Sequence, residues 1–355
     1  MKMIIDGKAV DSSDGKVLNV LNPATGEVID TVPLATEDDV NKAVSCAKEA
    51  QKIWAKVPVY EKVEILKKFI NLVLENKEDL ARTLSNETGK PIKEARAEIA
   101  NIPIAFDAFS EKAKHLYGTV VPAGLEAGQD KNILFTQMEP IGVVACVIPF
   151  NFPCDLYDQK VAPALLAGNA AIVKPSTDNP LTLCKLTELM VKAGVTPGAI
   201  QIITGRGSSV GSWLCSNPDV HLVTLTGSTE VGIETAKACA DNLTHVALEL
   251  GGNDAFIVLE DADIDLATDE LLWGRMYNTG QVCCASKRFL VHKNVASEFS
   301  KKAVEKISAI KAGMPSDEDS ELGCLISERA AIKVEDQVNL TVSQGGKVIL
   351  GGNRN

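Results

Sequence analysis

The chain has 355 residues and a formal net charge of −11, and 45% of its residues are hydrophobic and 23% charged. This length predicts one or two domains with sizeable cores, and the composition is typical of a globular protein in water. The negative charge argues against nucleic acid or an anionic membrane as a partner. Aromatic residues make up only 5% of the chain, which leaves few side chains to stack on bases.

Several other protein classes are excluded by what the sequence lacks. No apolar run approaches the roughly 18–20 residues that span a membrane, and residues 1–7 become polar too early for a signal peptide. The nine cysteines have no regular spacing, so we expect reduced thiols and a cytoplasmic protein. The four histidines are scattered and no Cys-x-x-Cys pair occurs, so we expect no metal site.

The first third of the chain predicts short strands followed by a layer of helices. Residues 1–35 contain strand-like runs separated by turn dipeptides. Thr36, with Asp39 three residues later, resembles a helix N-cap, and apolar residues then recur at helical spacing from residue 40. Further helical patterns cover about 60–76, 78–86 and 91–115.

From residue 142 the sequence predicts a parallel sheet. Residues 119–140, just before it, are extended and turn-rich, which predicts a hairpin that protrudes from its domain. Short apolar strands then alternate with helices, a pattern typical of βαβ units with helices on both faces of a sheet. The expected strands are 142–148, 170–173, 199–203, 222–225 and 245–248, and the expected helices are 155–167, 180–194, 208–215 and 229–240. Ligands bind beyond the carboxyl ends of such strands.

A second α/β domain is expected to begin near residue 252. The expected strands are 255–259, 289–291 and 347–350, and the expected helices are 264–277 and 296–311. The fold class is therefore α/β, with a Rossmann-like parallel sheet formed by residues 1–118 and 141–251. The second domain, at 252–355, stops directly after a strand and a turn, so we expect only the N-terminal part of it to be present.

Three loops at the strand ends carry polar groups that suit a ligand. The first holds Asn151 between two prolines, where its amide can donate to an oxyanion, although an asparagine chosen for turn geometry is the plain alternative. The second begins with Lys174, which either reaches a ribose or phosphate or lies on the surface. In the loop at 226–232, a Gly-Ser turn either presents N–H groups to a phosphate or simply caps a helix at Ser228.

The loop after the third strand has two interpretations. Gly205, Gly207 and Gly211 form a Gly-x-Gly-x-x-x-Gly pattern, one residue longer than the dinucleotide fingerprint. The same loop places Ser209 between Gly207 and Gly211, at the spacing of a hydrolase nucleophile elbow. A hydrolase of that kind also needs a His-Gly-Gly oxyanion loop, which the sequence lacks, so we disfavour this interpretation.

The fifth strand ends at Glu249, and a thiol follows at Cys283. A carboxylate at the end of a buried strand destabilises the fold unless it is paired or its pKa is raised. A carboxylate whose pKa is raised toward neutrality suits the role of a general base. A buried cysteine is commonly just a small apolar residue. The Gly280-Gln281 turn and nearby helical sequence instead suggest a setting that lowers the pKa of the Cys283 thiol. Loops at five successive strand ends favour one shared site.

Together these residues closely resemble the aldehyde dehydrogenase superfamily, along nearly the whole chain. The matching motifs are Asn-Pro-Ala-Thr-Gly at 22–26, Glu-Thr-Gly-Lys-Pro at 87–91, Glu-Pro-Ile-Gly-Val at 139–143, Pro-Phe-Asn-Phe-Pro at 149–153, Thr-Gly-Ser at 226–228, Glu-Leu-Gly-Gly at 249–252 and Gly-Gln-Val-Cys at 280–283. Local segments are more similar to the semialdehyde- and lactaldehyde-oxidising branch than to the phosphorylated glyceraldehyde branch. The resemblance implies that residues 1–118 and 141–251 bind NAD(P) and that residues 252–355 belong to the catalytic domain.

The resemblance also implies a role for each loop. Cys283 would be the nucleophile and Glu249 the general base, and the spacing after Gly-Gln leaves Cys284 as a neighbour. Asn151 and the Cys283 N–H would form the oxyanion hole, while Lys160 matches a lysine that helps to relay the proton from the base. The implied cofactor-binding residues are Ile148, Pro149, Phe150, Lys174, Ser176, Thr177, Gly207, Gly211, Gly227, Ser228, Val231, Leu250 and Gly251.

The implied reaction oxidises a small-molecule aldehyde to a carboxylic acid through a thiohemiacetal and a thioester on Cys283. The expected cofactor is NADP or NAD, with NADP slightly favoured. Members specific for NAD often carry a Glu three residues after the ribose-binding lysine, and Thr177 in its place removes a repulsion against a 2′-phosphate. Val282 stands where the glyceraldehyde-3-phosphate enzymes have Arg, which disfavours a phosphorylated substrate.

Two alternatives stay open at this point. A coenzyme A-acylating dehydrogenase is the first, although such members commonly lack the base that Glu249 supplies. Family members are also substantially longer, and the part beyond residue 355 would complete the catalytic domain and the subunit contact. A complete chain of this length would therefore be a catalytically incomplete cofactor-binding fragment. As part of a longer protein it would keep the mechanism and form a homodimer or homotetramer, with the hairpin at 119–140 in the oligomer contact.

Overall fold

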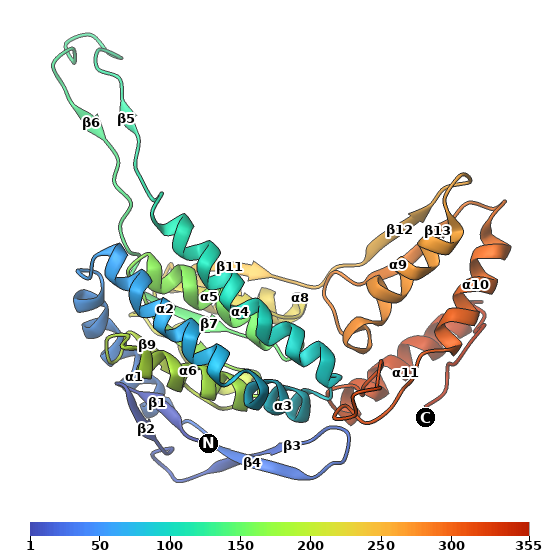
Figure 1. Ribbon diagram of the computed structural model, residues 1–355. Coiled ribbons are helices and arrows are strands. Elements are labelled where there is room, and N and C mark those ends of the chain that lie inside the picture. Colours follow the sequence, from blue (N-terminus) through green and yellow to red (C-terminus); the bar gives the residue numbers. More distant parts are fainter. Residues whose placement is uncertain (355) are drawn as a thin grey trace.

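One large, mostly parallel sheet organises the greater part of the chain (Figure 1). The computed structural model describes residues 1–354. Five parallel strands are β7 (Val143–Val147), β8 (Ala170–Lys174), β9 (Ile200–Ile202), β10 (Leu222–Thr226) and β11 (His245–Glu249). Antiparallel β1 (Met3–Ile5) and β2 (Lys8–Val10) extend the sheet beside β9. The order is β11-β10-β7-β8-β9-β1-β2.

Helices cover both faces of this sheet, as the sequence predicted. They are α1 (Glu37–Trp54), α2 (Val59–Glu75), α3 (Lys77–Thr88), α4 (Ile92–Ala113), α5 (Pro153–Leu166), α6 (Leu181–Ala193), α7 (Ser212–Ser216) and α8 (Thr229–Ala240). Successive side chains of a strand point to opposite faces. Val144 and Cys146 of β7 therefore pack into the core with α2–α6, while Val143 and Ala145 pack into the core with α1, α7 and α8.

The strand order creates a switch point between β7 and β10. From β7 the chain winds outward through β8 and β9, then returns to the other side of β7 to form β10 and β11. At such a point the loops that follow the two neighbouring strands diverge and leave a crevice at their carboxyl ends. The loop after β7 contains Asn151 and the loop after β10 contains Ser228, so the topology brings two of the predicted loops to one crevice.

Residues from 254 onward form a smaller arm, visible at the right of Figure 1. It comprises the parallel strands β12 (Asp254–Val258) and β13 (Ser286–Val291) and the helices α9 (Ile264–Met276), α10 (Ala296–Ser308) and α11 (Glu328–Ser343). Its core is small and gathers Val258, Ile264, Leu271, Phe299 and Ala303. The other side of the strands is uncovered, since Ile257, Leu259 and Leu290 are 64%, 61% and 52% exposed.

The end of the arm differs from the prediction. The strand expected at 347–350 is wrong, because these residues are exposed and pair with no other strand. Helix α11 was not anticipated. It begins at an N-cap formed by Ser327, whose hydroxyl accepts the Ala330 N–H at 3.3 Å, but it contains no buried residue. Val334, Val338 and Val342 nevertheless recur along α11 at helical spacing, so the sequence did contain a signal for this helix.

Two hairpins lie outside the main sheet. One pairs β3 (Val17–Leu21) with β4 (Val28–Pro33) along the lower side in Figure 1. The other pairs β5 (Val120–Val121) with β6 (Leu134–Phe135) and projects far from the body of the molecule. Among residues 1–354, no helix is long and apolar enough to cross a membrane.

Helix α5 contains a buried carboxyl group without a partner. Asp158 is 1% exposed, and neither of its carboxyl oxygens has a hydrogen-bond partner among residues 1–354. Burial, reinforced by the nearby charge of Asp155, raises the pKa of Asp158 to about 9. A buried polar group without a hydrogen bond destabilises a fold, and an ionised one does so more strongly.

This carboxyl group makes stability depend on pH. Because its folded-state pKa is raised, its contribution is most favourable below the ordinary value of 3.8 and is lost as the pH rises toward about 9. Relative to Asp158→Asn, we expect the native chain to lose up to about 1.4 kcal/mol of unfolding free energy per pH unit in this window. Urea titrations at pH 5, 7 and 9 measure this difference, with the exposed Asp107→Asn as control. Parallel pH curves for the native chain and Asp158→Asn would contradict it.

Candidate active site

Two loops that are far apart in sequence meet at the crevice. The side-chain amide of Asn151, in the loop after β7, donates from Nδ2 to the Gln281 carbonyl at 2.9 Å. In return, the Nδ2 of Asn278 donates to the Asn151 carbonyl at 3.0 Å. An amide nitrogen carries two N–H groups, so one of those on Asn151 fixes the side chain while the other is available to an oxyanion. The turn geometry alternative for Asn151 therefore does not account for its side chain.

The turn that precedes Cys283 has an unusual backbone. The short helix η2 (Tyr277–Gly280) contains Asn278 and Thr279 in left-handed conformation, at φ 49° and φ 56°. For a β-branched residue such as Thr279 this region is sparsely populated, and each such residue costs about 1–3 kcal/mol. Strained backbone of this kind persists only where its surroundings hold it, and it gathers at functional sites.

Cys283 lies exposed beyond this turn. The Lys287 ammonium donates to its carbonyl oxygen at 2.8 Å, and a Cβ placed on Gly252 would lie 3.6 Å from the same oxygen. The segment that follows Glu249 therefore passes beside the cysteine. Partial burial, and then the neighbouring Cys284, raise the pKa of the Cys283 thiol above its ordinary value. The expectation of a lowered thiol pKa is wrong, because partial burial and the neighbouring Cys284 thiol outweigh the backbone hydrogen bonds that lower the pKa of Cys283.

Glu249 is exposed at the end of β11. The buried strand expected for it is wrong, because β11 forms the edge of the sheet and most of its residues face solvent. The Lys160 ammonium donates to Thr224 Oγ1 at 3.1 Å. Burial lowers the pKa of Lys160, while Cys146 and Glu249 oppose this shift. The charge of Glu249 thus acts on Lys160, which places the predicted base and the predicted relay lysine near each other.

The lysine predicted to bind the cofactor ribose is buried. Lys174 is 3% exposed, and its ammonium donates to the Pro175 carbonyl at 2.7 Å. Burial lowers the pKa of Lys174 to about 8. A Cβ placed on Gly207 would lie 3.9 Å from this ammonium, so the loops after β8 and β9 adjoin here. The alternative of a surface lysine is wrong.

Hydrogen bonds also link the loops after β7, β8 and β9 around this lysine. Thr177 donates to the Gly205 carbonyl at 3.3 Å, and Ser176 accepts the N–H of Asp178 at 3.3 Å. The Ile148 N–H donates to the Lys174 carbonyl at 3.0 Å. Of the remaining predicted residues, Pro149 and Phe150 follow Ile148 in the same loop, Gly211 ends the π-helix Gly207–Gly211, and Gly251 lies exposed after β11.

The loop after β10 serves as a helix cap. The Ser228 hydroxyl accepts the Val231 N–H at 3.3 Å and starts α8, as the plain interpretation of this loop expected. The Gly227 N–H donates to the Glu249 carbonyl at 3.0 Å. A Cβ placed on Gly232 would lie 2.7 Å from Leu250 Cδ2, so the first turn of α8 packs against Leu250. The predicted cofactor residues that follow β10 therefore lie beside Leu250, which follows β11.

The hydrolase interpretation finds no support. The Ser209 hydroxyl donates to the Arg206 carbonyl at 3.3 Å, and no histidine forms a hydrogen bond with it in the described part of the chain. Residues 1–354 also contain no group of three or more His, Cys, Asp or Glu side chains that could hold a metal ion.

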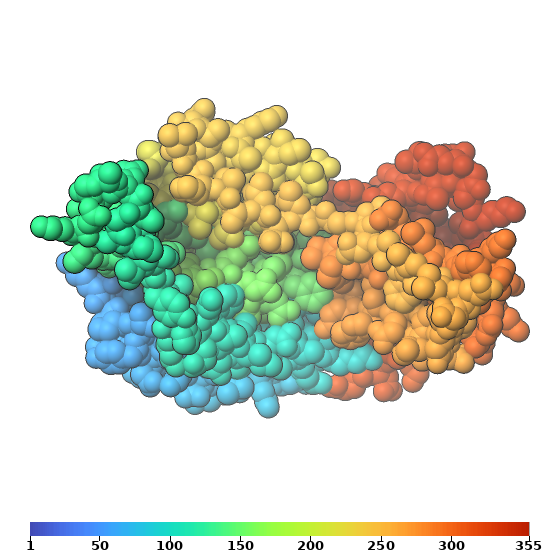
Figure 2. Space-filling view, turned by 90° about the horizontal axis from the view of Figure 1, so that it is seen from above, coloured from blue at the N-terminus to red at the C-terminus, as the bar shows by residue number. Residues whose placement is uncertain are grey.

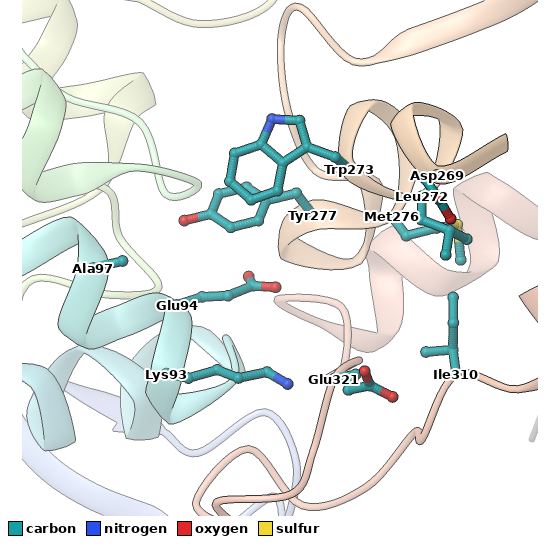
Figure 3. Close-up of a pocket in the computed structure, with 10 residues that line it drawn as sticks. All are labelled: Lys93, Glu94, Ala97, Asp269, Leu272, Trp273, Met276, Tyr277, Ile310 and Glu321. Carbon is teal, nitrogen blue, oxygen red and sulfur yellow. The ribbon is translucent and has the colours of Figure 1, made fainter. Parts of the chain in front are cut away.

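A cavity of about 500 Å³ lies beside the strained turn, between α4 and the smaller arm (Figure 3). Its lining residues are Lys93, Glu94, Ala97, Asp269, Leu272, Trp273, Met276, Tyr277, Ile310 and Glu321. Glu94 points into it, and burial raises the pKa of Glu94 to about 7 against the opposing hydrogen bond from the Asn278 N–H. None of the predicted catalytic residues lines this cavity, and the sequence did not anticipate it.

The raised pKa of Cys283 predicts how its reactivity depends on pH. Because the pKa of the Cys283 thiol is raised, little of this thiol is ionised at pH 7. Its alkylation by iodoacetamide should therefore rise about tenfold per pH unit from pH 7 to 9, followed by mass spectrometry of the peptide that carries it. Cys284→Ser removes the neighbouring thiol and should speed alkylation of Cys283 at pH 8. A plateau below pH 8 would contradict this expectation.

Comparisons with known proteins identify the relatives of this chain. The model of the Aldehyde dehydrogenase family matches residues 9–355. The D-glyceraldehyde dehydrogenase (NADP(+)) of Picrophilus torridus is 38% identical, and the match covers 100% of this chain and 71% of that protein. The succinate-semialdehyde dehydrogenase [NADP(+)] of Escherichia coli is 36% identical over 98% of this chain and 72% of its own length.

A solved structure shows the same fold. The crystal structure of an E. coli NADP dependent enzyme superimposes with a TM-score of 0.96 at 35% identity, over 100% of this chain and 73% of that one. The predicted α/β fold class and the predicted enzyme class are both confirmed. With its match from residue 9 to residue 355 and relatives above 30% identity, the chain belongs to the aldehyde dehydrogenase family.

Proposed function

We propose that the chain oxidises an aldehyde to a carboxylic acid with NADP or NAD, using Cys283 as the nucleophile. The observation that carries this proposal is the hydrogen bond between Asn151 Nδ2 and the Gln281 carbonyl. It joins the predicted oxyanion donor to the turn that carries the predicted nucleophile, in a chain that matches the family from residue 9 onward.

In the first step the Cys283 thiolate adds to the aldehyde carbon, and the electron pair of the C=O bond moves to the oxygen. The free N–H of the Asn151 amide donates to that oxyanion, together with the N–H of Cys283. Removal of one such donor typically slows an enzyme by about 10²–10³-fold, so the orientation of Asn151 matters to the rate. The product of this step is a thiohemiacetal on Cys283.

NADP or NAD, when bound, accepts the hydride from the thiohemiacetal carbon. The residues present fit such a cofactor, because a buried lysine at the end of β8 adjoins the glycine loop after β9 at the edge of the crevice. Lys174 would hold the ribose, with Gly207 and Gly211 beside the adenine and Gly227 and Ser228 beside the pyrophosphate. The other predicted cofactor residues surround these.

In the last step Glu249 takes a proton from water, which adds to the thioester carbon and expels the Cys283 thiolate. Lys160 would then pass that proton onward, since Glu249 is one of the groups that oppose the lowering of the Lys160 pKa by burial. Overall, one aldehyde, one water and one oxidised cofactor give one acid, one reduced cofactor and one proton. Exposure of Glu249 leaves it open to water, which supports a role in hydrolysis.

Cofactor choice and substrate class follow from the loop after β8 and from the relatives. Thr177 brings no carboxylate to this loop, and both curated relatives named above carry NADP(+) in their names. This supports NADP over NAD. One relative is named for D-glyceraldehyde and the other for succinate semialdehyde, which supports a small polar aldehyde as substrate. Neither is named for acylation of coenzyme A, and Glu249 is present, so we favour hydrolysis.

Two further proposals concern the setting of the enzyme. The β5–β6 hairpin exposes Val120, Ile133 and Phe135 by 77%, 84% and 67%. Exposed apolar side chains on a protruding element suit a subunit contact, so we propose that the protein forms a homodimer or homotetramer. The nine cysteines are all free, which supports a reducing compartment such as the cytoplasm.

The proposal is tested by initial rates with an aldehyde panel. Succinate semialdehyde, lactaldehyde and simple aliphatic aldehydes are each assayed with NADP and with NAD, and the reduced cofactor is followed by its ultraviolet absorbance. We expect turnover of at least one aldehyde with a higher kcat/KM for NADP, because no carboxylate at position 177 repels a 2′-phosphate.

Matched variants identify the nucleophile in the same assay. Cys283→Ala should abolish turnover, whereas Ser209→Ala and Cys284→Ser should retain it. Strict dependence on NAD would refute the cofactor argument. A chain that binds NADP but reduces it with none of these aldehydes would refute the proposed activity and favour a cofactor-binding fragment.

A further inference from the structure

The first turns of helix α4 present buried charges to the two loops of the site. Lys90 lies just before Pro91, the N-cap of the helix, and Glu94 and Glu98 lie four residues apart on one of its faces. Their exposed fractions are only 1%, 8% and 1%. Charged side chains are rarely buried to this degree unless each is paired or hydrogen-bonded. Lys90 and Glu98 pair with each other, and the further partners of the three side chains lie in or beside the loops that carry Asn151 and Cys283.

Lys90 and Glu98 together hold the loop after β7. They form a buried ion pair with each other. The Lys90 ammonium also donates to the Asn151 carbonyl at 3.0 Å and lies 3.9 Å from the centre of the Phe152 ring. The second carboxyl oxygen of Glu98 accepts the Cys154 N–H at 2.8 Å, at the start of α5. The backbone from Asn151 to Cys154 is therefore fixed at both ends.

Glu94 holds the turn before Cys283 from the same helix. Its carboxylate accepts the buried N–H of Asn278 at 2.9 Å. Asn278 is the first left-handed residue of the strained turn, and its side chain reaches the Asn151 carbonyl. Without Glu94 this buried N–H would lack a partner, and the left-handed turn would lose the contact that fixes its first residue.

We propose that α4 is the positioning element of the oxyanion hole, with Glu94 fixing the turn before Cys283 while Lys90 and Glu98 fix the loop of Asn151. This inference rests on the proposed function and names residues that act through others, since none of the three is a predicted contact of the substrate. Donors for an oxyanion act best when they are held in place before the reaction, and an error of about 1 Å can cost about 10²-fold in rate.

Substitution of Glu94 gives the sharpest test of this proposal, because its neighbour Lys93 can be substituted as a matched control. Glu94→Ala removes the acceptor for the Asn278 N–H, whereas Glu94→Gln keeps an oxygen in its place. Lys93→Ala alters the same cavity and removes a charge that lowers the pKa of Glu94, but Lys93 forms no hydrogen bond to either loop in the described part of the chain. A purely structural role for Glu94 would lower stability without a specific effect on the oxyanion.

Two reactions of Cys283 that need no cofactor distinguish a positioning role of Glu94 from a purely structural one. Acylation by 4-nitrophenyl acetate passes through an oxyanion, whereas alkylation by iodoacetamide does not. We expect Glu94→Ala to slow acylation about 10–100-fold while alkylation changes less than about threefold. Glu94→Gln and Lys93→Ala should remain near the native acylation rate. Unchanged acylation in Glu94→Ala, or an equal loss in both reactions, would overturn the proposal.

Lys90 and Glu98 need a double variant, because removal of one partner leaves an uncompensated buried charge that endangers folding. The variant Lys90→Met with Glu98→Gln removes both charges and retains an acceptor for the Cys154 N–H. We expect it to lose acylation selectively as well, because the Asn151 carbonyl loses its ammonium donor. Retention of the native acylation rate would contradict the role of the ion pair.

Hydrogen exchange tests the positioning even if the native chain shows no activity. Glu94→Ala should increase amide exchange across residues 277–283, while Lys93→Ala should not. A native chain that neither acylates nor oxidises any aldehyde would defeat the proposed function, and the exchange result would then decide the structural claim alone. Unchanged exchange across 277–283 in Glu94→Ala would overturn that claim.

Discussion

The hydrogen bond from the Asn151 amide to the Gln281 carbonyl is the contact on which the site depends. One partner belongs to the loop at the switch point of the sheet, and the other belongs to the turn that leads to Cys283. The sheet topology fixes the first partner, whereas the second returns from the smaller arm. In Figure 2, the light-green segment that contains α5 lies in a hollow between teal α4 and the yellow segments, with the orange part of the arm at its edge. The reaction in this crevice therefore requires the loop of Asn151 and the turn before Cys283 to keep their relative positions.

Holding these two segments in position lowers the stability of the fold at several residues. Asn278 and Thr279 adopt left-handed conformations, and Lys90, Glu94 and Glu98 bring charge into the interior. A buried ion pair is weak evidence of stabilisation, because desolvation of the two charges offsets their attraction. It does define geometry, since its hydrogen bonds have fixed directions and no water competes for them. The unpaired carboxyl of Asp158 on α5 adds a further cost for which the structure offers no compensating contact.

The fold could be predicted further than the site. Strands such as Val143–Val147 are continuous apolar runs between turn signals, so their pattern is local and readable. The family resemblance located Cys283, Glu249 and Asn151 by motif. The carboxylates of α4 were missed, because acidic residues four apart on a helix ordinarily indicate a solvated face. Exposure of Glu249 and the raised pKa of Cys283 depend on which neighbours cover an edge strand and a thiol, and a single sequence does not display such neighbours.

The central claim is that Cys283 forms a thioester, which water activated by Glu249 then hydrolyses. Intact mass spectrometry of Glu249→Gln, incubated with NADP and an aldehyde that the native chain oxidises, tests it most directly. Without the base, hydrolysis should lag behind hydride transfer. A mass increase equal to the acyl group should accumulate and map to the peptide that carries Cys283, and Cys283→Ala should prevent it. Full turnover by Glu249→Gln with no acyl adduct, or an adduct on another residue, would contradict the account.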